Sequence, residues 1–258
     1  MEHRVAIKQT KAFTLMELLV VISIIVLLIG MLMPALSGGR KAARDTTCKS
    51  QLRQVAIAFD VFTIDHRDHL PGTYTSVWVG PEPWQKSWMG KETWPVVTFE
   101  GTIIQYISGG AQAAKKLYRC PDLPQGGFRS GSGSNGLFDY TSLLSFSGAK
   151  FTGVPAKSKV IDPTTQEVRS AFTPLVVEED PLWHVNNCCV DPGHSNVDRL
   201  GQWHSGSGNY ASLDSHVESL RFTNGLGPTT HDWTALTPSG VEVSLTAHGS
   251  GWAGWNTR

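Results

Sequence analysis

The sequence has no excess of charge of either sign, since 22 Lys and Arg residues balance 22 Asp and Glu residues. Basic side chains form no run longer than Arg40-Lys41, with Arg44 close by. Nucleic acids are bound by clustered cations, so this pattern argues against nucleic acid as the main partner. Charged residues make up only 17% of the chain, and 9 Trp and 10 Phe supply apolar bulk, so the composition is not that of a disordered chain.

Enzyme motifs are lacking as well. The chain contains no Gly-x-Ser-x-Gly nucleophile elbow and no His-Glu-x-x-His metal motif. The Gly-rich stretch 126–136 lacks the Lys of a phosphate-binding loop, and we interpret it as a flexible loop. We therefore expect no enzymatic activity.

Apolar residues are concentrated near the N-terminus, where residues 13–36 contain a single charged side chain, Glu17. A helix over this range is ~36 Å long, enough to cross a hydrocarbon core of ~30 Å. We predict one membrane-spanning helix. A secretory signal peptide and a plain signal anchor are the alternatives, while a buried core helix is disfavoured because both faces are apolar.

The beginning of this apolar run has a specific pattern, Lys11-Ala12-Phe13-Thr14-Leu15-Met16-Glu17. It resembles the N-terminal processing motif of type IV prepilins and type II secretion pseudopilins, whose basic leader is cut before a Phe that is then N-methylated. The resemblance implies a leader over residues 1–12, removed by a prepilin peptidase/methyltransferase, and methylation of Phe13. Ala12 stands where the family usually has Gly, and both are small.

Glu17 and Pro34 extend this resemblance. A carboxylate inside a spanning helix costs several kcal/mol unless it is paired or lies near an interface. The resemblance implies that Glu17 pairs with the free α-amino group of a neighbouring subunit, and the alternative is that it reaches the headgroup layer. Pro34 falls where many pilins have a helix-kinking Pro.

An amphipathic stem is expected over residues 37–66, continuing the spanning helix beyond the break in the apolar run at Ser37-Gly38-Gly39. Its apolar residues recur at helical spacing, at Leu52, Val55, Ala56, Phe59 and Phe62. Residues 67–258 are rich in Gly, Pro, Ser and Asn and indicate an extracytoplasmic domain of short elements. The expected fold is therefore α+β and pilin-like, with the long helix packed on a C-terminal antiparallel β domain.

Within this domain, short helices are expected at 95–107 and 111–117, and strands at 140–146, 175–177, 210–213 and 217–222. The last two strands are expected to form a hairpin with Asp214-Ser215-His216 at its tip. The segment is similar to a motif near the C-terminus of prepilin-like proteins from planctomycete-type bacteria, in which nine residues separate a His from an Asp-Gly pair. His204 and Asp214 have that spacing, but Ser215 replaces the Gly, which disfavours a turn with positive φ.

The chain has four cysteines, Cys48, Cys120, Cys188 and Cys189. Four cysteines can be joined into two disulfides in three ways. We favour Cys48 with Cys120, which would clamp the stem to the domain, over a strained bond between the adjacent Cys188 and Cys189. No pair has the close spacing of zinc ligands. Outside the cytoplasm such disulfides persist.

Histidines and aspartates crowd residues 184–216. Asp191, Asp198 and Asp214 are candidate calcium ligands, because calcium prefers oxygen. We favour the alternative, that these side chains hold loops through bonds to the backbone, and we expect no cofactor. Trp252 and Trp255 are candidates for an exposed glycan- or protein-binding surface.

The expected function is a pseudopilin-like structural subunit of a type II secretion or type IV pilus-like machinery. It would span the inner membrane once, with a cytoplasmic N-terminus and a periplasmic or extracytoplasmic domain, and pack against other pseudopilins through the N-terminal helix. This orientation comes from the resemblance, because basic residues flank both ends of the span. Secretion pseudopilus, pilus, DNA-uptake filament and anchored monomer all stay open. A membrane-anchored binding domain and an anchored metal-dependent hydrolase are the alternatives from other classes.

Overall fold

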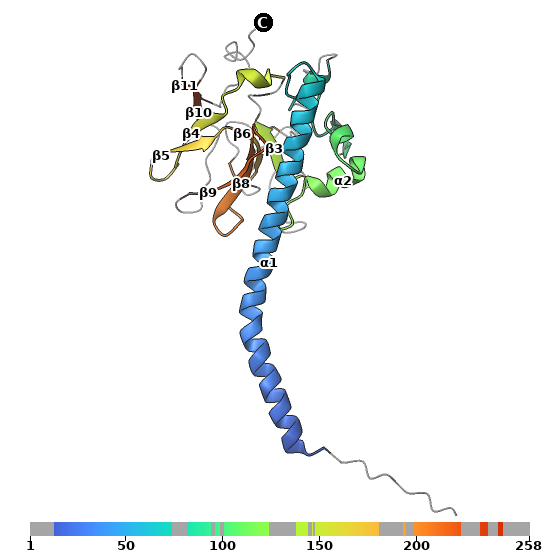
Figure 1. Ribbon diagram of the computed structural model, residues 1–258, viewed down its shortest axis with the longest axis vertical. Coiled ribbons are helices and arrows are strands. Elements are labelled where there is room, and N and C mark those ends of the chain that lie inside the picture. The colour runs from blue at the N-terminus through green and yellow to red at the C-terminus, as the bar shows by residue number, and fades with distance from the viewer. Residues whose placement is uncertain are drawn as a thin grey trace, which may run out of the picture. The chain divides into compact units, whose positions relative to one another are not determined.

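Figure 1 shows the computed structural model of the chain. The structure describes residues 13–73, 82–93, 96–98, 101–123, 138–143, 146, 148–180, 193–194, 199–222, 233–236 and 242–244. The chain divides into two compact units, Met1–Ala43 and Arg44–Arg258. Helix α1 (Leu15–Asp65) supplies most of the described part of the first unit and the first element of the second.

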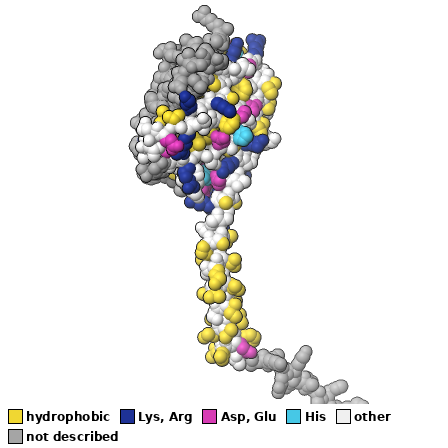
Figure 2. All heavy atoms as spheres, turned by 60° about the vertical axis from the view of Figure 1, so that its left-hand side comes forward, with side chains coloured by type: hydrophobic (Ala, Val, Ile, Leu, Met, Phe, Trp, Pro, Cys, Tyr) yellow, Lys and Arg dark blue, Asp and Glu magenta, His cyan; other side chains and the backbone are white. Residues whose placement is uncertain are grey.

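In the first unit, α1 exposes apolar side chains around its whole circumference, as the space-filling view in Figure 2 shows for one face. Exposure persists from Leu15, at 88%, to Leu36, at 55%. Of the helices that the structure describes, α1 is the one long and apolar enough to cross a membrane. This part of the chain fits a single-pass membrane anchor.

The helix runs without interruption through Pro34 and Ser37-Gly38-Gly39, so the membrane half and the stem form one long helix, as expected. Pro34 has no N–H to donate to the carbonyl of Gly30, one turn earlier, and each Gly costs ~1 kcal/mol relative to Ala. Helix growth is cooperative, because every added residue gains a hydrogen bond after the first turn has formed. The helical segments on both sides are long, so the helix continues through these residues despite their cost.

In the second unit, α1 buries one face against the domain, and its buried residues are Cys48, Leu52, Val55, Ala56, Ala58, Phe59, Phe62 and Thr63. This face contains the apolar positions that the helical spacing predicted. The helix ends at Asp65, as expected, and the chain turns through Arg67 and Asp68, which both have positive φ.

The main sheet of the domain has five strands in the order β7-β3-β6-β8-β9. The strands are β3 (Tyr140–Leu143), β6 (Pro174–Glu178), β7 (Gly193–His194), β8 (Ser207–Ser212) and β9 (Val217–Arg221). All neighbours are antiparallel except β3 and β7. Strands β8 and β9 form the expected hairpin, in which Ala211 pairs with Val217.

A second sheet has the order β11-β10-β4-β5 and is antiparallel. Its strands are β4 (Lys157–Ile161), β5 (Val168–Phe172), β10 (Trp233–Leu236) and β11 (Glu242–Ser244). The remaining elements are the paired strands β1 (Lys91–Thr93) and β2 (Val96–Thr98), helix α2 (Gly110–Leu117), and the 3-10 turns η1 (Pro83–Gln85), η2 (Ile104–Tyr106) and η4 (Phe151–Gly153). A long N-terminal helix followed by an antiparallel β domain confirms the expected pilin-like α+β fold.

The helix expected at 95–107 is wrong, because this segment contains strand β2 and the short turn η2. Val96, Val97 and Thr98 are β-branched and favour a strand. Gly101 then approaches the backbone of Trp88 so closely that a Cβ at this position would overlap it. The prediction of a helix at 111–117 is confirmed by α2, and strands lie within or across each of the four ranges predicted to hold them.

An aromatic core fills the space between α1 and the domain. The rings of Phe59 and Trp88 lie 5.4 Å apart, and Trp88 meets Tyr118 edge to face at 5.2 Å. Tyr140 and Tyr210 of the main sheet are fully buried in the same core. This packing orients the polar side chains described next.

Candidate functional site

The start of α1 is closed by a capping box. The Thr14 N–H and the Thr14 hydroxyl both donate to Glu17 Oε2, each at 2.9 Å, and the Glu17 N–H donates to Thr14 Oγ1 at 3.2 Å. Reciprocal bonds of this kind satisfy donors that a helix start leaves without partners. Glu17 is therefore held at the N-terminal edge of the apolar helix, and its carboxylate retains capacity to accept further hydrogen bonds.

The residues of the expected processing motif fall at this helix start. Phe13 is the first described residue and is 73% exposed, while Ala12 and the leader lie outside the described residues. Pro34 lies inside α1. Cleavage at Ala12, methylation of Phe13 and the kinking role of Pro34 stay predictions.

A second polar site is buried in the domain, around His204. His204 Nε2 lies 3.0 Å from Glu178 Oε1, at the end of β6. On the other side of the ring, Nδ1 lies 3.3 Å from Asp122 Oδ2 and 3.4 Å from Asp45 Oδ1. The side chains of His204 and Glu178 are almost completely buried, so these carboxylates surround a histidine that water barely reaches.

The disulfide between Cys48 and Cys120 borders this site, with the two Cα atoms 5.3 Å apart. It joins α1 to the segment after α2, which is the pairing favoured from the sequence. Cys120 Sγ also lies 3.6 Å from His204 Nε2. Because the bond closes a loop with a sequence separation of 72 residues, chain entropy alone predicts a stabilisation of ~4 kcal/mol.

Asn209 of β8 ties the buried carboxylates together. Its backbone N–H donates to Glu178 Oε2 at 2.9 Å, and its side-chain amide donates to Asp45 Oδ1 at 2.8 Å. Lys49 donates to the other oxygen of Asp45 at 2.8 Å. The stem and the sheet are thus linked by polar contacts as well as by apolar packing.

Burial sets the protonation behaviour of this cluster. Desolvation raises the pKa of Glu178 above its ordinary value of 4.5, against the opposing effect of His204. Desolvation lowers the pKa of His204, but the hydrogen bond and charge of Glu178, with the charges of Asp45 and Asp122, raise it on balance above 6.5. His204 is therefore favoured in its protonated form, which balances part of the surrounding negative charge.

The hairpin tip contacts α1 at a second place. The Ser215 hydroxyl donates to Asp60 Oδ2, and the His216 N–H donates to Asp214 Oδ1 at 3.3 Å. Ser215 has φ of 59°, so the turn with positive φ does form and the expectation from its missing Gly is wrong. The hydrogen bond to Asp60 offsets the cost of the left-handed conformation, which is ~1–2 kcal/mol for a residue with a side chain.

The hairpin therefore runs along the stem. Its two attachment points, Asp45 and Asp60, are separated on α1 by ~22 Å at 1.5 Å per residue. On the hairpin, β8 is extended from Asn209 to Ser212, which spans ~10 Å, and the turn at the tip then brings Ser215 to Asp60. We call the Asp45–Asn209 and Asp60–Ser215 contacts the two polar anchors.

The expected calcium ligands are not assembled within the part of the chain that the structure describes. Asp214 borders a pocket of about 500 Å³ together with Asp60 and Asp68. Asp191 and Asp198 lie outside the described residues, as do Cys188, Cys189, Trp252 and Trp255. Asp214 accepts hydrogen bonds from Ser212 and His216 within the hairpin tip, as the structural interpretation of this residue expects.

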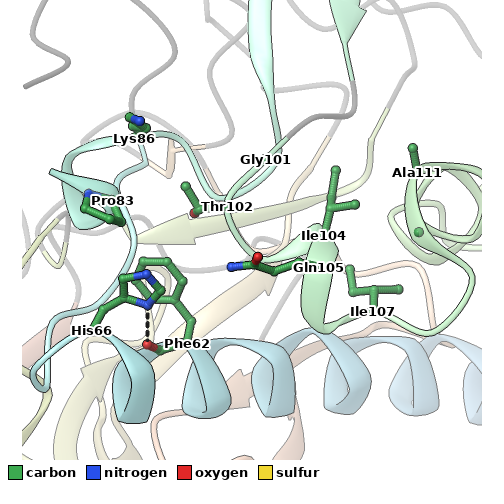
Figure 3. Close-up of a pocket in the computed structure, with 11 residues that line it drawn as sticks. Phe62, His66, Pro83, Lys86, Gly101, Thr102, Ile104, Gln105, Ile107 and Ala111 are labelled. Atoms are coloured by element: carbon green, nitrogen blue, oxygen red, sulfur yellow. Dashed lines mark hydrogen bonds between the residues drawn. The ribbon is translucent and has the colours of Figure 1, made fainter. Parts of the chain in front are cut away.

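Figure 3 shows a larger pocket of about 670 Å³ between α1 and the segment around η2. Phe62, Ile104 and Ile107 supply its apolar walls, and His66 and Lys86 its ionisable side chains. His66 is held by a contact of its Nδ1 with the Phe62 carbonyl, at 2.8 Å. None of the described residues that line it is an Asp, Glu, Cys or Ser.

Sequence reasoning identified His204, Cys48 and Cys120 but missed Glu178, Asp45 and Asn209. The sequence did contain one signal for Glu178, which is the last residue of the otherwise apolar strand Pro174–Glu178. A carboxylate buried at the end of such a strand needs hydrogen-bond partners. Asp45 carried no such signal, since it lies among polar residues on a helix.

The geometry defines a class of protein: a pilin-like α+β chain, with an exposed apolar helix start and a stem clamped to its sheet domain. A comparison with curated proteins agrees. The chain is 28% identical to the type IV wide pilus major component PilA4 of Thermus thermophilus over 115 residues, which cover 45% of this chain and 85% of that protein. No family model matches the chain, and no solved structure matches it.

Proposed function

We propose that this protein is a structural subunit of a type IV pilus-like filament. The observation that carries the proposal is α1, a single helix that changes from exposed apolar side chains to a stem with one face buried in a β domain. So much exposed apolar surface requires lipid or other apolar helices as a partner. The likeness to a pilus component favours a pilus over a type II secretion pseudopilus.

Maturation would begin at the membrane. A prepilin peptidase/methyltransferase would cut between Ala12 and Phe13 and methylate Phe13, on the cytoplasmic side of the inner membrane. The capping box holds Glu17 beside the new N-terminus, where its carboxylate can meet the α-ammonium group of an incoming subunit. Pairing of the two charges removes the cost of leaving either one alone in an apolar surrounding.

Assembly would then continue along the stem. Ile57, Val61 and Ile64 are apolar yet exposed, at 45%, 38% and 79%, and their spacing places them on one face of α1. This stripe extends the apolar surface available to neighbouring stems beyond the membrane. The domain would lie outside the cytoplasm, which the Cys48–Cys120 disulfide supports because such bonds persist in oxidising compartments.

Intact mass spectrometry of the full chain, coexpressed with a prepilin peptidase or without it, tests this function. We expect a chain that begins at methylated Phe13 with the peptidase and at Met1 without it. A chain that begins at Met1 in both cases, or near Ser37, would contradict the proposal and leave an anchored or secreted domain.

A further inference from the structure

Four buried side chains that are distant in sequence converge around the disulfide. One ligand atom from each of Cys48, Cys120, Glu178 and His204 lies within 4.8 Å of the others. We propose that, when the disulfide is reduced, these four side chains bind one Zn²⁺ ion. The site is independent of filament assembly and uses no residue of the N-terminal motif.

Two distances between ligand atoms are close to those of a tetrahedral zinc site. Zn–S and Zn–N bonds of ~2.3 and ~2.0 Å place the two ligand atoms ~3.6 Å apart at a tetrahedral angle. Cys120 Sγ and His204 Nε2 lie 3.6 Å apart. His204 Nε2 and Glu178 Oε1 lie 3.0 Å apart, against ~3.4 Å expected for nitrogen and oxygen ligands. Once the disulfide is reduced, the two Sγ atoms must also move apart to ~3.8 Å, the separation of two zinc-bound sulfurs at a tetrahedral angle.

The surroundings also suit a metal. His204 Nδ1 is buried and has no hydrogen-bond partner among the described residues, although Asp122 Oδ2 lies at 3.3 Å. When a metal occupies Nε2, the ring proton resides on Nδ1 and faces this carboxylate, as is usual for histidines that bind metals. The Asn209 N–H orients Glu178 through Oε2 at 2.9 Å, while the Asn209 side-chain amide makes a longer contact of 3.4 Å with Oε1, the oxygen that would bind the ion.

Charge balance favours the ion as well. Two thiolates and the Glu178 carboxylate carry three negative charges in a site closed to water, and Zn²⁺ compensates two of them. The nearby cations Lys49 and Arg44 reach Asp45 and Asp122 rather than the four ligands. Without the ion, the reduced chain would keep its thiols protonated, because burial disfavours isolated thiolates.

Reduction and binding are separate steps. A phosphine reductant takes the oxygen of one water molecule to become a phosphine oxide, and the disulfide gains two electrons and two protons to form two thiols. Binding of Zn²⁺ then releases both thiol protons and any proton held between His204 and Glu178.

The test uses the full chain in detergent, reduced with a phosphine and titrated with Co²⁺ as a spectroscopic probe. We expect one Co²⁺ per chain, with the visible bands of a tetrahedral ion and a thiolate-to-metal charge-transfer band that Zn²⁺ abolishes. The oxidised chain should show neither. Far-UV circular dichroism of each sample reports whether the fold is present.

Matched variants identify the ligands. Cys188→Ser/Cys189→Ser should bind as the parent does, whereas Cys48→Ser/Cys120→Ser, also without the disulfide, should lose the charge-transfer band. Glu178→Gln keeps the shape of the side chain and should weaken binding and alter the visible bands. Asp122→Asn should weaken binding by about 10- to 100-fold while keeping those bands.

Several results would overturn the proposal. They are a folded, reduced parent chain with no charge-transfer band, a band that depends on Cys188 and Cys189, and an unchanged spectrum in Glu178→Gln. If reduction unfolds the chain, Zn²⁺ should restore the native circular dichroism, because metal binding supplies folding free energy. Failure of Zn²⁺ to do so would equally overturn it.

Discussion

At the scale of single residues, two acidic side chains have opposite situations. Glu17 lies at an exposed helix start, where its own capping box already uses part of its hydrogen-bonding capacity. Glu178 is fully buried and depends on His204 and Asn209. The first carboxylate is available to another molecule, and the second belongs to the interior of this one.

Glu17→Gln tests the availability of the first carboxylate. The amide keeps a hydrogen-bond acceptor for the helix cap but cannot neutralise an α-ammonium group. We expect normal insertion and cleavage with strongly reduced filament yield, measured by sedimentation of sheared filaments. Thr14→Ala is the matched control, since it removes the cap at a cost of ~1 kcal/mol and keeps the charge. Equal yields from Glu17→Gln and the parent would contradict the pairing role.

The His204–Glu178 pair predicts a pH dependence of stability. The folded-state pKa of each group lies above its ordinary value, so its stabilisation is present at low pH and is lost as the pH rises through the folded value. We expect the free energy of unfolding, measured by urea titration, to fall as the pH rises above 4.5 for the contribution of Glu178 and above 6.5 for that of His204.

Two histidine variants test whether His204 causes this pH dependence of the free energy of unfolding. His204→Gln leaves Glu178 buried without its cation and should cost ~3 kcal/mol near pH 6, and less at higher pH. His216→Ala, at the exposed hairpin tip, should keep the pH profile of the parent. A pH-independent free energy of unfolding in the parent would show that His204 is not charged in the folded chain.

At the scale of elements, the hairpin β8–β9 depends on its tip. Ser215 combines an unfavourable backbone conformation with a favourable bond to Asp60. Ser215→Ala keeps the cost of the left-handed backbone and loses the hydrogen bond to Asp60. Ser215→Gly also loses the hydrogen bond, but it removes the backbone cost. We therefore expect Ser215→Ala to be less stable than Ser215→Gly by ~1 kcal/mol, from urea denaturation midpoints. The opposite order would mean that the turn changes conformation in one variant.

Periodic elements were predictable from the sequence, and sites built from distant residues were not. The stem followed from its helical spacing, and the hairpin from two apolar strands around a polar tip. Strand β4 was missed because one of its two buried side chains is the polar Ser158, and β5 because Ala171 is its one buried residue. Nothing local to Asp45 or Glu178 predicts that they face the same histidine, because tertiary packing alone brings β6 against α1.

At the scale of the whole molecule, we expect the disulfide to contribute more to the free energy of unfolding than any other single link between the stem and the sheet. Cys48→Ala/Cys120→Ala should lower the free energy of unfolding by ~4 kcal/mol, measured by urea titration of the full chain without added metal. Cys188→Ala/Cys189→Ala is the matched control and should change it much less. A loss below ~1 kcal/mol in the first variant would indicate that the unfolded chain is already compact around this loop.

The two polar anchors and the disulfide have a mechanical consequence. A force applied along the stem within Arg44–Arg258 would act in shear across the hairpin, since the two polar anchors are ~22 Å apart along α1. Contacts spaced along a sheared interface share the force and fail together, whereas contacts peeled from one end fail in turn. A subunit built this way transmits tension from its helix to its sheet without unravelling at either end of the hairpin.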